Sequence, residues 1–406
     1  MTVGASASPS TDSPLPDHVP PALTRRFDHL QDPGFLADPF AGFDALYEGP
    51  DIFWSTAWGG FWVLTREELI RDVLQNPEAF SSNPVGIPGT PRARPLIPLE
   101  LDPPDHTWFR RVLAPHFSNA AAERRAGAVR EIAEQLVDRF ADRGECEFMG
   151  DFAQPFPTAI FVSLLGLPHE EAPQFLEWNW TMLHAYHDPV ARQAAGADVA
   201  AYLGGVVDER ARSPRDDLIS HMLAAEVHGR SLTRDEVVNM CFLLFLAGLD
   251  TVTAALGFCI LHLARSTAAR RALVADPSLV PAAIEELLRA YPIVQATRTV
   301  VADIDLGGVA MRTGDRVLVG TTLASRDPRA HPSSTVVDFD RPSKRNLAFG
   351  AGPHRCLGSH LARHELIAAI HALHARVADY RLAGGAELRF WGGGVLGLET
   401  LPLVWR

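Results

Sequence analysis

The longest helical signal in the sequence runs from Thr233 to Leu263 and limits the possible folds most strongly. Thr233 can cap this helix while Glu236, three residues on, completes a capping box. The stretch Cys241–Leu249 has no polar side chain, so by hydrophobicity the helix either spans a membrane or crosses a protein core. Its polar residues favour the core: Asn239, Asp250, Thr251 and His262. We therefore expect a buried central helix.

Composition and charge indicate a globular protein rather than a nucleic-acid binder. The chain has 406 residues, of which 47% are hydrophobic, and no linker or internal repeat divides it. Its formal charge of −12 lacks the basic character of a general nucleic-acid binder. Its 4 cysteines are widely scattered, which suits a reducing cytoplasm. We expect a cytoplasmic monomer without a membrane or nucleic-acid partner.

Residues 1–21 are rich in Ser, Pro and Thr and contain no apolar stretch. They predict a loose tail, followed by one domain over residues 22–406. Helical periodicity dominates that domain, for example over residues 120–143, 190–212 and 361–377. Strand-like runs are short: residues 61–64, 299–306 with 309–311, 316–320 and 401–405. The pattern predicts a mainly α protein with small β-sheets.

A polar interruption occurs inside the long helix at Ala247-Gly-Leu-Asp-Thr251. The Thr251 hydroxyl can donate a hydrogen bond to the carbonyl of Ala247, which weakens the helical ladder where Gly248 allows close approach. Two interpretations remain open from these residues alone. The segment is either a functional site or a packing kink in which a neighbour satisfies the buried acid.

A glycine-rich loop surrounds one cysteine, in Phe349-Gly-Ala-Gly-Pro-His-Arg-Cys-Leu-Gly358. Three glycines and a proline allow a tight turn that can lie close to a flat partner. A helix is expected to begin near Leu357, and its amides favour a thiolate at Cys356. The loop therefore predicts an activated thiol beside a flat ligand.

Two other interpretations compete for Cys356. One is a small buried side chain, which the glycine loop disfavours. The other is a zinc site built from His354, Cys356, His360 and His364. Helical geometry weakens the zinc interpretation, since His360 and His364 fall opposite the apolar face formed by Ala362, Leu366, Ala369, Ile370 and Leu373.

These motifs together resemble the cytochrome P-450 family, and most closely its bacterial camphor 5-monooxygenase group. The loop matches F-x-x-G-x-x-x-C-x-G at Phe349, Gly352, Cys356 and Gly358, with A-G-x-D-T at 247–251 and E-x-x-R at 286–289 ahead of it. The resemblance implies a triangular helical body with a long central helix over haem b. It also implies that Cys356 is the axial ligand of the haem iron.

The resemblance assigns further residues to the haem. Glu286 and Arg289, with Arg341, are expected to form a buried network that supports the haem loop. His106 and Arg110, four residues apart, together with Arg298 and His354, match positions that bind the haem propionates. Phe349 and Gly358 belong to the loop that contacts the haem.

Oxygen activation is implied for Asp250 and Thr251, which would direct protons so that one oxygen atom enters a C–H bond and the other leaves as water. The chain has no flavin or nicotinamide fingerprint and no cysteine cluster, so the electrons are expected from a [2Fe-2S] ferredoxin and its ferredoxin reductase. Candidate docking residues are Arg110, Arg111, Lys344, Arg345 and Arg355. An alternative is a peroxide-using haem-thiolate enzyme, which usually departs from the Asp-Thr pair.

The substrate is expected to be small and apolar. The resemblance places six residues around it: Gly86, Leu243, Leu246, Val294, Gly394 and Val395. The camphor enzyme anchors its substrate with a tyrosine, whereas residues 86–101 contain none here, and it has bulkier residues in place of Gly86 and Gly394. We therefore predict a terpenoid or norisoprenoid substrate other than camphor.

Overall fold

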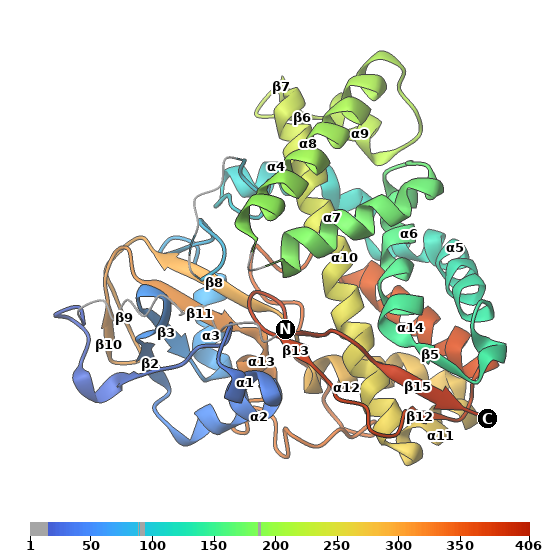
Figure 1. Ribbon diagram of the computed structural model, residues 1–406. Coiled ribbons are helices and arrows are strands. Elements are labelled where there is room, and N and C mark those ends of the chain that lie inside the picture. The colour runs from blue at the N-terminus through green and yellow to red at the C-terminus, as the bar shows by residue number, and fades with distance from the viewer. Residues whose placement is uncertain (1–14, 88, 90–93, 186–187) are drawn as a thin grey trace.

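Helices form most of the body, and the largest sheet lies at one side of it (Figure 1). Figure 1 shows the computed structural model, which describes every residue except 1–14, 88, 90–93 and 186–187. The outline is roughly triangular, and the C-terminus lies at the end of β15, on the side of the molecule opposite the largest sheet (Figure 1). The expected class, mainly α with small β-sheets, is confirmed.

The helices account for most of the described chain. They are α1 (Pro33–Ala37), α2 (Pro39–Asp44), α3 (Glu67–Gln75), α4 (Asp105–Leu113), α5 (Asn119–Asp138), α6 (Pro155–Leu164), α7 (Ala172–His184), α8 (Pro189–Arg212), α9 (Leu218–Ala224), α10 (Arg234–Arg265), α11 (Thr267–Ala275), α12 (Val280–Ala290), α13 (Thr321–Ser325) and α14 (Ser359–Arg376).

The strands are short and belong to several sheets. They are β1 (Thr24–Arg25), β2 (Ile52–Ser55), β3 (Phe61–Leu64), β4 (Phe80–Ser81), β5 (Glu145–Glu147), β6 (Glu226–Val227), β7 (Arg230–Ser231), β8 (Gln295–Val300), β9 (Ile304–Leu306), β10 (Val309–Met311), β11 (Arg316–Gly320), β12 (Tyr380–Leu382), β13 (Phe390–Trp391), β14 (Gly397–Leu398) and β15 (Pro402–Trp405). The largest sheet has the order β1-β2-β3-β11-β8-β4, and a second joins β12, β15 and β5.

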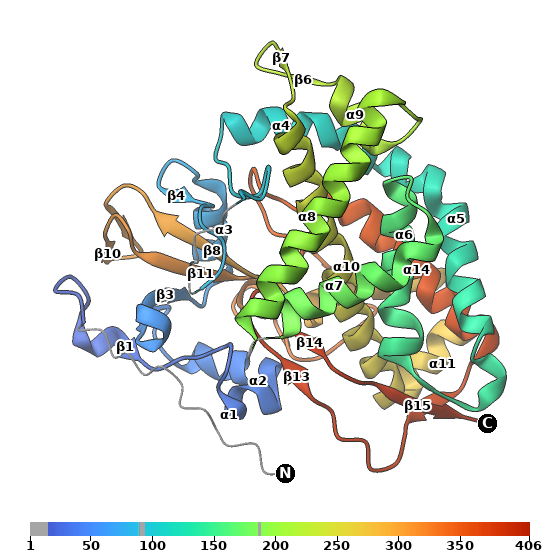
Figure 2. The same ribbon diagram turned by 45° about the horizontal axis from the view of Figure 1, so that its top comes forward.

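Helix α10 runs through the middle of the body, with α7 and α8 packed across it (Figures 1 and 2). Its capping box is confirmed: the Glu236 amide donates to Thr233 Oγ1 at 3.2 Å, and the Thr233 amide donates to Glu236 Oε2 at 2.8 Å. The helix is long and apolar enough to cross a membrane, but 72% of its most apolar window is buried inside the protein. It is therefore a core helix, as its polar residues indicated.

Two sequence boundaries were wrong. Helix α5 ends at Asp138 rather than near 143, because a short 3-10 turn and Gly144, with φ of 78°, redirect the chain into β5. The strand expected over 299–306 is two strands, since β8 ends at Val300 and β9 begins at Ile304 to pair with β10. The end of α8 at Arg212 matches the prediction.

The described part of the expected tail is packed onto the largest sheet. Val19 is 3% exposed, and His18 Nε2 lies 2.8 Å from Asp315 Oδ2 beside the edge of Trp54. The expectation of a loose segment up to residue 21 is therefore wrong for residues 15–21, while residues 1–14 lie outside the described chain. The apolar Val19, surrounded by polar and proline residues, was too weak a signal in the sequence.

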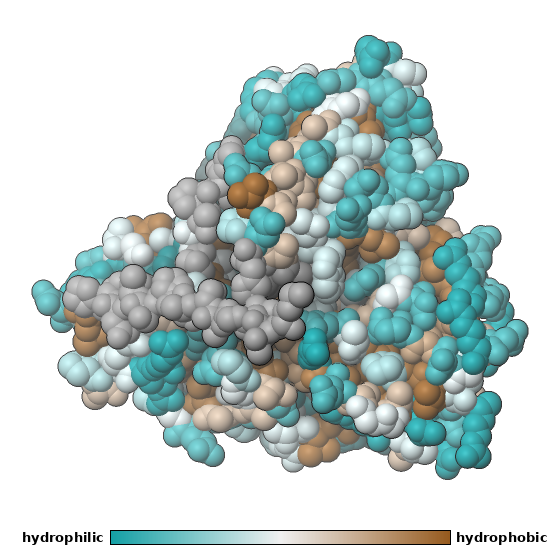
Figure 3. Space-filling view, viewed as in Figure 1, coloured by the Kyte–Doolittle hydropathy of each residue, from teal (hydrophilic) through white to brown (hydrophobic). Residues whose placement is uncertain are grey.

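Hydrophilic and hydrophobic residues are mixed on the coloured part of the face in Figure 3, where brown residues lie scattered among teal ones. Single exposed apolar side chains are normal for a protein in contact with water. This face therefore fits an aqueous surrounding.

Candidate active site

Cys356 is the accessible cysteine of this chain, and the other three are buried. Its loop is held by backbone hydrogen bonds, in which the Cys356 amide donates to Phe349 O at 2.8 Å and the Arg355 amide to Gly352 O at 3.1 Å. Gly352 has a φ of 68°, and a Cβ added there would lie 2.1 Å from the carbonyl oxygen of Leu74. Only glycine allows this close approach to the end of α3.

The thiol of Cys356 is accessible yet surrounded by protein atoms, and burial raises its pKa. The amide of Gly358 and the guanidinium groups of Arg110, Arg355 and Arg363 act in the opposite direction. The amide of Gly358 therefore acts on the thiol as the loop predicts, although the effect of burial is larger. A bound metal cation would complete the stabilisation, because a coordinating thiol is deprotonated.

The zinc interpretation finds no support in the geometry. Within the described residues, no group of three His, Cys, Asp or Glu side chains is placed to hold a metal ion. Cys356 is thus the lone candidate ligand of a cofactor that brings its own remaining donors.

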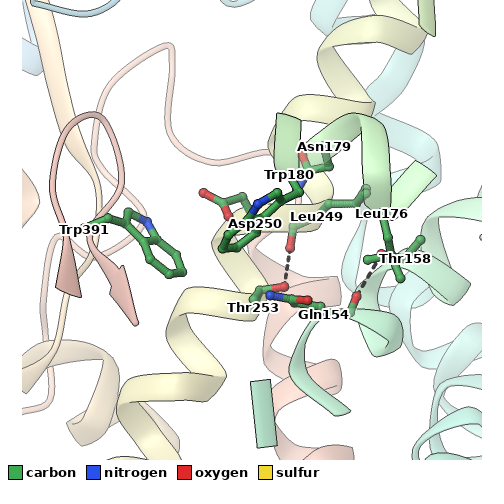
Figure 4. Close-up of a pocket in the computed structure, with 9 residues that line it drawn as sticks. All are labelled: Gln154, Thr158, Leu176, Asn179, Trp180, Leu249, Asp250, Thr253 and Trp391. Carbon is green, nitrogen blue, oxygen red and sulfur yellow. Dashed lines mark hydrogen bonds between the residues drawn. The ribbon is translucent and has the colours of Figure 1, made fainter. Parts of the chain in front are cut away.

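Helix α10 presents an accessible face inside an otherwise buried element. Ala247 is exposed, and Gly248 and Thr251 are half-buried, although most of their neighbours in the helix are buried. Thr251 Oγ1 donates to the carbonyl of Ala247 at 2.9 Å, so the predicted hydrogen bond is confirmed. Asp250 is 6% exposed and lines a cavity with residues of α6, α7 and β13 (Figure 4).

Two histidine rings meet between α4 and the cysteine loop. The ring centroids of His106 and His354 are 4.1 Å apart, and His106 Nδ1 and His354 Nε2 are buried without hydrogen-bond partners. Burial lowers the pKa of His106 to about 4 and that of His354 to about 2, with Arg110 and Arg298 adding to both effects. Both rings are therefore neutral at pH 7.

Two guanidinium groups stand beside these rings. Arg298 is 5% exposed, donates to the carbonyl of Thr297 at 2.7 Å, and has a pKa lowered to about 10 by burial. Arg110 donates to the carbonyl of Arg355. In the described chain, no carboxylate is hydrogen-bonded to either guanidinium, so the four side chains form a cluster of donors suited to an anionic group.

Glu286, Arg289 and Arg341 come together as predicted. Glu286 and Arg289 are fully buried, and Glu286 accepts from Arg289 Nε and Nη2 at 2.9 Å and from Arg341 Nε at 3.0 Å. Arg289 also donates to the carbonyl of Ser325, whose hydroxyl accepts from the Leu347 amide at 3.0 Å. The network therefore reaches the start of the cysteine loop through Ser325, which the sequence gave no reason to single out.

Three of the expected pocket residues are adjacent. Val294 and Val395 pair in an isolated antiparallel bridge, and the Gln295 amide donates to Gly394 O at 2.8 Å. A Cβ added to Gly394 would meet nothing within 4 Å, so the space beside it is open. Leu243 is buried and Leu246 half-buried on α10.

Gly86 needs a different explanation from pocket size. Its φ is 90°, a conformation that favours glycine whatever the surrounding space, and its amide donates to Thr297 Oγ1 at 2.9 Å.

The five proposed docking residues differ in how exposed they are. Arg111, Arg345 and Arg355 are exposed, whereas Arg110 and Lys344 are half-buried.

Comparison with known proteins decides which cofactor this arrangement holds. The family model described as cytochrome P450 matches residues 206–276 and 273–374. A relative from Sinorhizobium fredii, described as probable cytochrome P450 127A1, is 37% identical over 97% of both chains. The chain belongs to the cytochrome P450 family. Another relative, described as mycinamicin IV hydroxylase/epoxidase and from Micromonospora griseorubida, is 34% identical over 85% of this chain and 89% of that protein.

Solved P450 structures agree with the whole fold. The crystal structure of cytochrome P450 CYP101C1 is similar with a TM-score of 0.90 and 35% identity, over 97% of this chain and all of that chain. The structure of CYP101J2 gives 0.89 and 32% over the same shares. This protein therefore has the P450 fold and uses haem. It is a monooxygenase similar to bacterial P450s of the CYP101 group.

The residues present fit a haem. The accessible thiol of Cys356 supplies one protein ligand to iron, as the family requires. The orphaned ring nitrogens of His106 and His354, with the guanidinium groups of Arg110 and Arg298, match the need of two propionates for buried donors. Without such an anion, burial of these polar groups would destabilise the folded protein with nothing to offset the loss.

Proposed function

We propose that this P450 inserts one atom of O2 into a C–H bond of a small terpenoid or norisoprenoid other than camphor. Electrons would come from a [2Fe-2S] ferredoxin and its reductase in the cytoplasm. The observation that supports the oxygen-insertion role is the accessible face of α10. There Ala247, Gly248 and Thr251 are accessible in an otherwise largely buried helix, next to the buried Asp250.

Haem, when bound, supplies dioxygen chemistry, and a thiolate ligand favours cleavage of the O–O bond. Cys356 would hold the iron, while Arg110, Arg298, His106 and His354 would bind the propionates. Phe349 and Gly358 would shape the loop, and Glu286, Arg289 and Arg341 would support it. Thr251 would offer its hydroxyl on the accessible face of α10, and Asp250 would pass protons toward it.

A substitution at Thr251 tests the oxygen-insertion role. Thr251→Ala removes the hydroxyl that donates to Ala247 O but leaves the cysteine loop intact. We expect the variant to retain haem and to divert reducing equivalents from product to hydrogen peroxide. Thr251→Ser, which keeps a hydroxyl, is the control and should stay close to wild type. Unchanged coupling in Thr251→Ala would remove Thr251 from the mechanism, and peroxide-driven turnover exceeding donor-driven turnover would favour the peroxide-using alternative.

The substrate proposal rests on the open space beside Gly394, next to the Val294–Val395 bridge. Leu243 and Leu246 would complete apolar walls, and Gly86 would lie at the edge of the pocket. Titration of the ferric protein with camphor, other terpenoids, norisoprenoids and macrolides tests the proposal through the spin-state shift. We expect a non-camphor terpenoid or norisoprenoid to give the largest shift with tight coupling. The largest shift with camphor, or with a macrolide, would overturn it.

The donor proposal rests on local charge. Arg111, Arg345 and Arg355 are exposed cations near the cysteine loop of a chain whose net charge is −12. An acidic ferredoxin would be attracted to such a local patch. The rate of reduction by a [2Fe-2S] ferredoxin should be several-fold lower in Arg111→Gln than in wild type. Added salt should lower the wild-type rate more steeply than the rate of the variant. Rates independent of both would argue against docking at this patch.

A further inference from the structure

A turn at residues 84–87 follows β4 and carries Gly86, which the proposed function places at the edge of the pocket. The last residue of β4, Ser81, pairs with Thr299 of β8, so the turn begins beside that strand (Figure 2). Ile87, at the end of the turn, is 7% exposed and belongs to the hydrophobic core. The turn is therefore packed into the body of the protein, and its position affects the shape of the pocket beside it.

Arg316 of β11 supplies the hydrogen bonds that hold this turn. Its Nη2 donates to the carbonyl of Pro84 at 2.8 Å and to that of Gly86 at 2.6 Å. Gly86 has a φ of 90°, which other residues rarely adopt, and in this conformation both carbonyls meet one nitrogen. Gly89 also lies close to the guanidinium, since a Cβ added there would be 3.1 Å from Arg316 Nη1. The turn therefore folds around the end of this side chain.

No carboxylate competes with the turn for this guanidinium. Among the described residues Arg316 forms no ion pair, and burial lowers its pKa. A cation taken out of water needs strong acceptors. Besides the two carbonyls, these are the hydroxyl oxygens of Thr299, at 2.8 Å from Nη1, and of Thr297, at 3.4 Å from Nη2. Since the Nε is buried without a partner in the described chain, the two Nη groups make every contact.

A buried acid binds the same turn through its amide. Glu100 is 5% exposed, and its carboxylate accepts from the Val85 amide at 3.2 Å and from the Leu96 amide at 2.9 Å. The peptide groups of the turn are thus bound by opposite charges, the amide of Val85 by the anion and the carbonyls of Pro84 and Gly86 by the cation. Hydrogen bonds to charged groups are stronger than those between neutral groups. The position of the turn is therefore fixed by side chains on both sides of it in the sequence.

Strand β8 connects the turn to the residues proposed to bind the haem. Thr297 Oγ1 accepts from the Gly86 amide at 2.9 Å, and Thr299 Oγ1 donates to the carbonyl of Asn83 at 3.1 Å. Successive side chains of a strand point to opposite faces, so Arg298 points away from both threonines. On its own face Arg298 belongs to the cluster proposed for the propionates. A shift of the turn along β8 would therefore be a shift relative to the haem.

We propose that Arg316 is a positioning residue for substrate selection, which holds the turn at 84–87 on β8 so that the pocket edge at Gly86 fits a small ligand. Glu100 acts with it on the same turn. The inference rests on the proposed function, which places Gly86 at the pocket. A pocket that is ordered before binding loses less conformational entropy on binding, and selectivity is a difference between affinities. Release of the turn should therefore weaken a small ligand more than a bulky one.

The test compares the Kd values of two ligands in spin-state titrations of the haem-loaded enzyme. One is the best terpenoid or norisoprenoid of the panel, and the other is the bulkiest panel compound that gives a measurable shift. Arg316→Leu removes every donor, whereas Arg316→Lys keeps the charge on a single nitrogen. Arg312→Met is the matched control, because Arg312 lies just before β11 and pairs with Asp303 where the two side chains are 52% and 53% exposed.

We expect Arg316→Leu to raise the Kd of the small ligand about tenfold and to raise that of the bulky ligand less than about twofold. Turnover of the small ligand should show a similar rise in KM with a smaller change in kcat. Because Arg316 donates to neither the cysteine loop nor α10, haem content and the carbon-monoxide spectrum should match wild type. Arg316→Lys should recover part of the selectivity, and Arg312→Met should keep all of it.

Equal weakening of both ligands in Arg316→Leu would assign Arg316 to stability alone and overturn the proposal, as would an unchanged ratio of the two Kd values. If Arg316→Leu does not fold, Thr297→Val takes its place, because it removes the acceptor of the Gly86 amide with little change in shape. The ratio should then move in the same direction by about threefold, and an unchanged ratio refutes the proposal. The proposed substrate class fails by a different result, the largest spin-state shift of the wild type with camphor or a macrolide.

Discussion

Arg289 offers the sharpest test of how the fold supports the haem loop. Its guanidinium makes five hydrogen bonds, two to Glu286 and three to the carbonyls of Ser325, Ser334 and Val336, at 2.8–3.2 Å. The substitution Arg289→Met keeps much of the volume but removes every one of these donors. Glu286 would then stay buried with only Arg341 and a backbone amide as partners.

Breaking a buried ion pair by removing one partner costs about 3–5 kcal/mol, because an uncompensated charge stays inside the protein. We expect Arg289→Met to lower the free energy of unfolding by that amount. The loss should be accompanied by a lower haem-to-protein ratio, since Ser325 links Arg289 to the Leu347 amide before the loop. Denaturant titration followed by circular dichroism measures the first quantity, and absorption spectroscopy the second.

Arg376→Met is the matched control for Arg289→Met. Arg376 pairs with Asp138 at 2.8 Å, but their side chains are 42% and 53% exposed, so its loss should cost less than about 1 kcal/mol. An Arg289→Met variant no less stable than Arg376→Met, or one with full haem content, would refute the reasoning about the network.

Two further outcomes follow from local geometry. Gly352→Ala should cost more than about 2 kcal/mol and reduce haem content, since the new Cβ would lie 2.1 Å from Leu74 O at a φ of 68°. Gly384→Ala, where a Cβ meets nothing within 4 Å, is its control, and equal stability of the two would contradict the prediction. Burial lowers the pKa of His29 to about 4, and Asp28 acts in the opposite direction. As the pH falls below 6.5, this imidazole therefore takes up a proton in the unfolded protein before it does so in the folded protein. Wild type should therefore lose about 2 kcal/mol more stability than His29→Phe between pH 7 and pH 5, and parallel pH curves in denaturant titrations would count against a neutral buried imidazole.

Local signals predicted the elements of the fold well. The capping box at Thr233 and Glu236 located the start of α10, and the hydroxyl of Thr251 was matched correctly to the carbonyl of Ala247. Each rests on residues three or four apart, which helix geometry brings together without help from the rest of the chain. The loop glycines were predicted to allow a tight turn beside a flat partner. The positive φ of Gly350 and Gly352 confirms the turn, whereas the close approach of Gly352 is to the carbonyl oxygen of Leu74.

Long-range packing was harder to predict. The glycine at position 86 was explained by pocket size, but its positive φ is itself a reason for glycine there, and the sequence alone does not reveal that φ. The pKa of Cys356 depends on how densely the folded chain surrounds the thiol, which no local pattern reports. The cavity in Figure 4 brings together α6, α7, α10 and β13, which span residues 155–391, so neither the cavity nor the contact between Trp180 and Trp391 had any signal in the sequence.

The central claim is that Cys356 binds haem iron as a thiolate, and the absorption spectrum of the reduced, carbon-monoxide-bound protein tests it most directly. The wild-type protein should show the thiolate-shifted Soret band. Cys356→Ala should lose that band, while Cys146→Ala, at a buried cysteine whose pKa is raised to about 12, should keep it. Absence of the shifted band in wild type, or its persistence in Cys356→Ala, would contradict the account.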